Sequence, residues 1–119
     1  MVDALISGYD YAPTILSLAG REVPEYMDGV SFWPVVDGQA EAIHGELFIG
    51  VGGYGAIRTR DWHYFAGVWD AAGRPQAADV SPHLYDLSRD REETANAAER
   101  HPDVVRELGR RLRERFAQK

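Results

Sequence analysis

The sequence of 119 residues contains no cysteine, only two methionines and no long run of apolar side chains. The absence of cysteine excludes a disulfide framework, a cysteine zinc site, an iron–sulfur cluster and a thiol nucleophile. The apolar runs fall far short of the roughly 20 residues that a transmembrane helix needs, so we expect no membrane partner. The basic start of a signal peptide is missing too, and both a cytoplasmic and a periplasmic location stay open.

Positive charge is also in short supply. Lys and Arg number 13 against 19 Asp and Glu, which gives a formal net charge of −6. Because an acidic chain repels the phosphate backbone of nucleic acids, we expect no nucleic-acid partner. The remaining composition, 45% hydrophobic and 27% charged, is that of an ordinary globular domain. A chain of this length buries about two-thirds of its unfolded surface, which is enough for one core.

Two segments have helical patterns. Residues 9–19 predict a short helix, in which Pro13 suits the first turn and Asp10 is a better N-cap than Ser7. The second pattern lies near the C-terminus, where Pro102 marks the first helical position. The apolar face of this second helix consists of Val105, Leu108, Leu112 and Phe116.

Between the two helices the pattern changes to that of strands. β-Branched and aromatic residues gather in four short segments, and two of these flank a polar turn and predict a hairpin. The segments are residues 46–51, 56–59, 62–65 and 83–87. The order of elements predicts an α+β fold. We expect a small antiparallel sheet of about four strands, an amphipathic C-terminal helix packed on one face, and a short N-terminal helix.

No complete set of catalytic residues is present, because the sequence has neither a Gly-x-Ser-x-Gly elbow nor a P-loop. His44 and Glu46 form an H-x-E pattern at the start of a predicted strand, which points both side chains to one face. Such a pair suits binding of a polar ligand or proton exchange. The alternative is two polar residues that face solvent. Arg58 and Arg60 either hold an anion or pair with a carboxylate on a neighbouring strand.

Two segments in the first part of the chain resemble the sulfatases of the alkaline-phosphatase-like superfamily. Residues 10–20 resemble the sulfatase segment D-x-x-P-T-x-x-x-x-A-G. Residues 28–38 resemble the segment that follows it in the family, in which D-G-x-S precedes a hydrophobic residue and a proline.

Two later segments continue the resemblance in the family's order. Residues 56–64 resemble the hairpin A-V-R-T-x-x-x-K-Y, with His63 in place of the lysine. Residues 84–98 resemble L-Y-D-L-x-x-D-P-x-E-x-x-N-L-A, with Arg91 in place of the proline and Ala97 in place of the leucine. Together, the four segments span nearly the whole chain.

The resemblance implies that the chain is the C-terminal part of a sulfatase. Residues 1–40 would end the large domain, and residues 41–119 would form the C-terminal subdomain. Sulfatases hydrolyse sulfate esters with calcium and a formylglycine, which is made from the first residue of a C/S-x-P-x-R motif. This motif and the family's metal-binding Asp-Asn pair are absent here. We therefore expect no catalytic residue, no metal site and no cofactor in this chain, and no activity of the chain alone.

The resemblance also implies a sulfated small molecule or sugar as the substrate of the whole enzyme. Similarity to the H-x-E of heparan-type N-sulfatases assigns His44 and Glu46 to the wall of the substrate pocket. Two alternatives stay open. The chain is either a freestanding binding or oligomerisation module, which self-associates through an exposed apolar face, or a fragment of a related phosphate-ester hydrolase.

Overall fold

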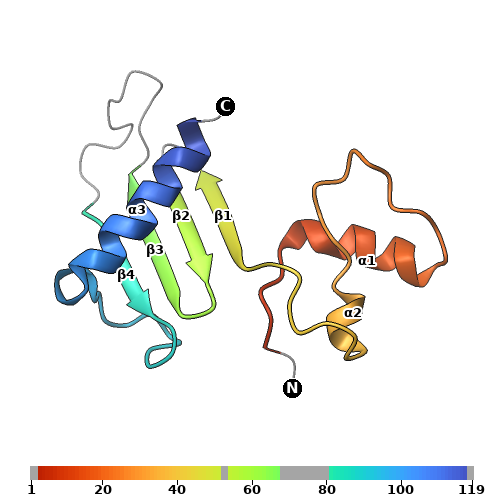
Figure 1. Cartoon of the computed structure of the whole chain (residues 1–119), viewed down its shortest axis with the longest axis horizontal. Coiled ribbons are helices and arrows are strands. Elements are labelled where there is room, and N and C mark those ends of the chain that lie inside the picture. Colours follow the sequence, from red (N-terminus) through yellow and green to blue (C-terminus); the bar gives the residue numbers. More distant parts are fainter. Residues whose placement is uncertain (1–2, 52–53, 68–80, 118–119) are drawn as a thin grey trace. The chain divides into compact units, whose positions relative to one another are not determined.

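The computed structural model of the protein describes residues 3–51, 54–67 and 81–117. The chain divides into two compact units, Met1–Leu47 and Phe48–Lys119. The first unit consists of short helices joined by loops, and the second is built on a sheet and a long helix (Figure 1). Within the described ranges, no helix combines the length and the apolar character needed to cross a bilayer.

The sheet contains four strands in the order β1-β2-β3-β4. Their bounds are Glu46–Val51 for β1, Tyr54–Thr59 for β2, Trp62–Gly67 for β3 and His83–Asp86 for β4. β3 is antiparallel to both β2 and β4. The predicted small antiparallel sheet is confirmed. The β2–β3 hairpin is longer than predicted because pairing of Tyr54 with Gly67 extends the ladder past the β-branched and aromatic residues.

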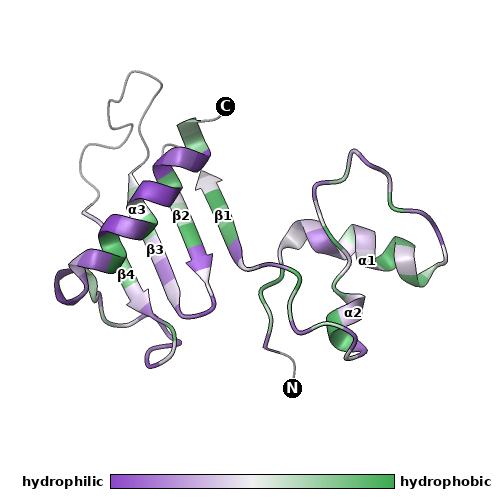
Figure 2. Ribbon diagram, in the orientation of Figure 1, coloured by the Kyte–Doolittle hydropathy of each residue, from purple (hydrophilic) through white to green (hydrophobic). Residues whose placement is uncertain are grey.

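Helix α3 (Pro102–Ala117) covers one face of the sheet, as predicted (Figure 1). Its apolar face is the predicted one, with two leucines buried and with Val105 and Phe116 packed against the core. The buried core consists of Ile57, Tyr64, Ala66, Leu84, Leu108 and Leu112. Hydrophilic and hydrophobic stretches alternate along the α3 ribbon, as expected of a helix with one apolar face (Figure 2). The core therefore joins α3 to three of the strands.

The first unit begins with a 3-10 turn, η1 (Gly8–Asp10), that leads directly into α1 (Tyr11–Leu18). The predicted N-terminal helix is confirmed, with Pro13 in its first turn. Gly20 follows the helix with a φ of +67°, a left-handed conformation that glycine adopts without strain. A single further turn, α2 (Trp33–Val36), lies later in the same unit.

The prediction that Asp10 caps the first helix is wrong. The Asp10 side chain makes no capping bond to α1, because its backbone is already helical, whereas an N-cap residue is typically extended. Ser7 has the extended backbone, and its Oγ accepts from the backbone N of Tyr9. The Asp10 carboxylate instead accepts from the backbone N of Ser7, which completes a capping box before α1, and from the backbone N of Val30 in a later segment.

Candidate functional site

The two predicted site residues, His44 and Glu46, lie where β1 begins. The His44 side chain keeps 20% of its surface exposed, and Glu46 is the partly buried first residue of the strand. Nε2 of His44 lies 2.8 Å from Oδ2 of Asp10, which is 34 residues earlier in the chain. Sequence reasoning therefore found one member of a polar pair and missed the other, Asp10, which it had interpreted as a helix cap.

The carboxylate of Asp10 is 1% exposed and is held by three hydrogen bonds. The backbone N of Val30 donates to Oδ1 at 2.9 Å, the backbone N of Ser7 donates to Oδ2 at 2.6 Å, and His44 is the third partner. Burial by itself raises the pKa of Asp10, but the two backbone donors and His44 together lower it below the ordinary value of 3.8. Asp10 is therefore ionised at neutral pH.

Two further contacts hold the loop after α1 against the start of that helix. Thr14 is buried, and its Oγ1 donates to the carbonyl of Asp10 at 2.6 Å and accepts from the backbone N of Phe32 at 3.0 Å. Gly29 packs directly on the backbone of Tyr9, where an added Cβ would overlap the carbonyl group. Packing of Gly29 on the neighbouring backbone and hydrogen bonds to the carboxylate together determine the position of the Asp10 side chain.

The lowered pKa of Asp10 predicts how stability depends on pH. A carboxyl whose folded-state pKa lies below its unfolded-state pKa stabilises the fold above the unfolded value, and this stabilisation is lost as the pH falls through the folded value. We expect the unfolding free energy to fall below about pH 4. The Asp10→Asn variant should show a shallower fall, measured by urea unfolding over a pH series. An identical slope in both proteins would contradict this role of Asp10.

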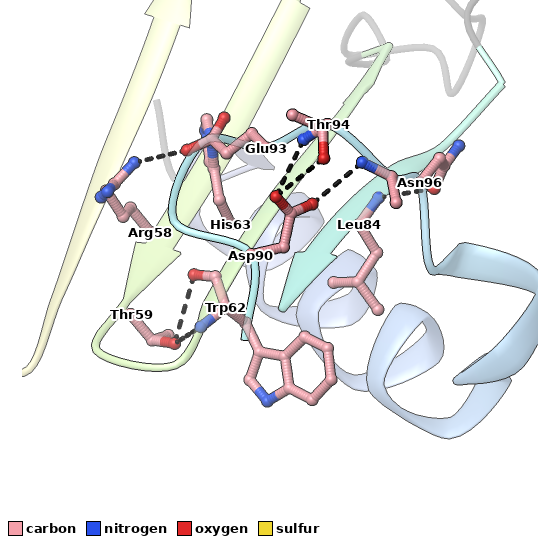
Figure 3. Close-up of polar contacts among 10 residues, drawn as sticks. Arg58, Thr59, Trp62, His63, Leu84, Asp90, Glu93, Thr94 and Asn96 are labelled. Atoms are coloured by element: carbon pink, nitrogen blue, oxygen red, sulfur yellow. Dashed lines mark hydrogen bonds and ion pairs between the residues drawn. The ribbon is translucent and has the colours of Figure 1, made fainter. Parts of the chain in front are cut away.

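A second polar cluster lies beside the sheet, in the second unit (Figure 3). Nη1 of Arg58 donates to Oε1 of Glu93 at 2.8 Å, and Nδ1 of His63 lies 2.9 Å from Oε2. Burial raises the pKa of Glu93, but the hydrogen bonds and charges of His63 and Arg58 produce a net lowering. The predicted pairing of Arg58 with a carboxylate is confirmed, although Glu93 lies in the loop after β4 and not on a strand. Both oxygens of Glu93 are engaged, and these contacts connect the loop to Arg58 on β2 and to His63 on β3.

Two other side chains shape the same loop (Figure 3). Asp90 accepts from N and Oγ1 of Thr94 at 3.1 Å and from N of Ala95 at 2.9 Å. Oδ1 of Asn96 accepts from the backbone N of Leu84 on β4 at 3.0 Å. Asp90 and Asn96 thus accept hydrogen bonds from backbone N–H groups of this part of the chain.

No three His, Asp or Glu side chains in the described part of the chain gather as metal ligands would. A hollow of about 320 Å³ in the second unit is lined in part by Asn96, Glu99 and Val105, and it includes neither His44 nor Glu46. The pair of Asp10 and His44 combines a buried charge with a partly exposed imidazole, and it is the candidate site.

Comparison with known proteins identifies the family to which this arrangement belongs. The family model for the C-terminal region of N-sulphoglucosamine sulphohydrolase matches residues 1–118. The chain belongs to this sulfatase family. The match confirms the resemblance that the four sequence segments indicated, and it covers both units of this C-terminal sulfatase region.

The curated relatives that match this region include arylsulfatase K from several vertebrates. Arylsulfatase K of Rattus norvegicus is 30% identical, and arylsulfatase K of Xenopus laevis is 24% identical; each match covers 94% of this chain. The chain spans only 21% of the length of the first relative and 22% of the second.

Solved structures share the fold. The structure of BT4656 in complex with its substrate D-glucosamine-2-N,6-O-disulfate matches with a TM-score of 0.64 at 23% identity, over 87% of this chain and 22% of that one. A second structure (BT33336S-sulf), from work on glycosaminoglycan metabolism by Bacteroides thetaiotaomicron, matches with a TM-score of 0.61 at 26% identity. That match covers 92% of this chain and 24% of the other.

Proposed function

We propose that the chain is the C-terminal part of a sulfuric-ester hydrolase that acts on a sulfated saccharide. The observation that carries this proposal is the family match over residues 1–118. The substrate class is supported by BT4656, whose substrate is a glucosamine disulfate. In this assignment the chain supplies structure and one wall of the substrate pocket, while the catalytic formylglycine and the calcium site belong to the larger part of the enzyme.

Within that wall, His44 and Glu46 are the residues that face the substrate. Support comes from their place at the start of β1. His44 is partly exposed there, and its Nε2 contacts the buried carboxylate of Asp10. An imidazole and a carboxylate supply both a donor and acceptors, which suits the hydroxyl and amine groups of a sugar. Replacing either residue should weaken saccharide binding.

The isolated chain is expected to be catalytically inert. It contains no cysteine and no C/S-x-P-x-R motif, so it lacks the nucleophile whose attack on sulfur begins sulfate-ester hydrolysis in the family. The test is an assay of the purified chain with an aryl sulfate and calcium, in which we expect no turnover above a heat-treated control. Turnover that survives repurification and scales with chain concentration would contradict the proposal.

The exposed face of α1 is the surface where we place the contact with the larger part of the enzyme. Tyr11, Ile15 and Leu18 follow the helical period and are all exposed, whereas the buried residues of α1 include the polar Thr14. A helix normally turns its apolar side inward, so an outward apolar stripe marks a surface that another element covers. Under this assignment, the first unit belongs to the large domain of the whole enzyme.

When that cover is missing, the chain is expected to self-associate through the α1 stripe. Ile15 is 64% exposed, so Ile15→Glu should leave the fold intact and convert the chain to a monomer in sedimentation velocity measurements. Ser17→Glu adds the same charge elsewhere on the exposed surface of α1 and is the matched control, which should still associate. A wild-type chain that stays monomeric at all concentrations would contradict this assignment.

A further inference from the structure

The pair of Asp10 and His44 joins a buried negative charge to an imidazole. A carboxylate that is 1% exposed costs free energy unless donors surround it. Two of its donors are backbone groups, from Ser7 and Val30, which fix the carboxylate within the first unit. The third donor, His44, keeps 20% of its side chain exposed. One end of the pair is therefore anchored, and the other reaches the surface.

The ionised carboxylate determines which nitrogen of His44 carries the proton. A carboxylate accepts hydrogen bonds and donates none, so Nε2 of His44 must donate across the 2.8 Å contact. In the neutral imidazole, Nδ1 then carries a lone pair and acts as an acceptor. Within the described ranges, the hydrogen bond of His44 involves Nε2, so Nδ1 is the nitrogen that can meet a ligand.

We propose that Asp10 is a positioning residue, which holds His44 so that Nδ1 accepts a hydrogen bond from a hydroxyl group of the bound saccharide. The proposal rests on the proposed function, in which His44 faces the substrate. A carboxylate behind an imidazole fixes both the tautomer and the plane of the ring, which prepares the acceptor before the ligand arrives. Losing one hydrogen bond of this kind corresponds to a roughly threefold to tenfold weaker affinity.

The first experiment tests the positioning without any saccharide. In long-range ¹H–¹⁵N NMR spectra of the labelled chain, we expect the proton of neutral His44 on Nε2. This proton should exchange slowly with water because it donates to a buried carboxylate. In Asp10→Asn the exchange should become fast, since an amide has one acceptor oxygen for three donors. A proton on Nδ1, or equally slow exchange in the variant, overturns the proposal.

Two replacements of His44 separate the contact with Asp10 from the contact with the saccharide. The amide nitrogen of glutamine reaches the place of Nε2 and still donates to Asp10, whereas asparagine places an acceptor near Nδ1 and stops short of Asp10. We expect His44→Gln to keep the wild-type unfolding free energy and to bind D-glucosamine-2-N,6-O-disulfate threefold to tenfold more weakly. His44→Asn should bind as weakly and also be less stable.

Affinities are measured by NMR titration of the full chain, with His83→Gln as the matched control. That variant has the same replacement at a histidine of the second unit and is expected to bind as the wild type does. If His44→Asn binds as tightly as the wild type, an acceptor near Nδ1 suffices without Asp10, and the positioning role is overturned.

Sodium sulfate at the same concentration distinguishes recognition of a hydroxyl from recognition of an anion. We expect the disulfated sugar to shift the His44 resonances and sulfate alone to leave them unchanged. Equal shifts from sulfate alone would overturn the assignment to a hydroxyl. If the Nε2 proton behaves as expected but the sugar shifts no His44 resonance, the pair exists without a substrate, and the placement of His44 at the substrate is what fails.

Discussion

Replacing Leu112 with alanine is expected to lower the free energy of unfolding by about 2–5 kcal/mol. Leu112 is 0% exposed and packs in the core that joins α3 to the sheet, where Ile57 and Leu84 are also fully buried. Removing its side chain loses apolar burial and leaves a cavity that a close-packed core fills only in part. Urea unfolding followed by circular dichroism measures the change.

The control for this prediction is Arg106→Ala in the same helix. Arg106 is exposed, and its ion pair with Asp103 at 3.1 Å joins two side chains in contact with solvent. Such pairs contribute little, so we expect a change within about 0.5 kcal/mol. If both variants lost the same stability, the buried face of α3 would have been assigned to the wrong residues.

The second large effect is expected at Gly29. A Cβ at this position would overlap the carbonyl group of Tyr9 and come within 3.0 Å of the backbone N of Asp10. Because the clashing atoms belong to the backbone, no side chain can rotate away, and the loop must move. We expect Gly29→Ala to cost about 3 kcal/mol or more. The loss should include the hydrogen bond from Val30 to Asp10, which hydrogen exchange at the Val30 amide would report.

Gly45→Ala is the matched control, because no atom lies within 4 Å of a Cβ at that position. Its stability should stay within about 1 kcal/mol of the wild type, and the change should favour folding where alanine restricts the unfolded chain. A Gly29→Ala protein with wild-type stability and a protected Val30 amide would show that the loop does not pack on Tyr9 as described.

Much of the fold follows from local patterns in the sequence. The face of α3 that carries Leu108 and Leu112 was predictable because side chains three to four residues apart share one side of a helix. The start of α3 at Pro102 was predictable because proline lacks the N–H group that the first helical turn does not use. The hairpin at residues 54–67 was predictable in place but not in length. Its far end depends on pairing with a glycine, whose own preference for strands is low.

The candidate site was only half predictable. His44 stood out through its spacing to Glu46, but its partner Asp10 is 34 residues away and has no periodic relation to it. The partner of Arg58 was expected on a strand and is Glu93, 35 residues away in a loop. A local pattern identifies which groups need a partner, but a hydrogen bond of 2.8 Å depends on how distant segments meet.

The sequence by itself determined the α+β class, the apolar face of the C-terminal helix and the relation to sulfatases, because each depends on residue order over short stretches. Only the tertiary structure decided what Asp10 does. Its carboxylate is buried, accepts a hydrogen bond from the backbone N of Val30 and contacts His44. Burial is a property of several segments packed together, so the same aspartate that suggests a helix cap in the sequence becomes an ionised support for an imidazole in the fold.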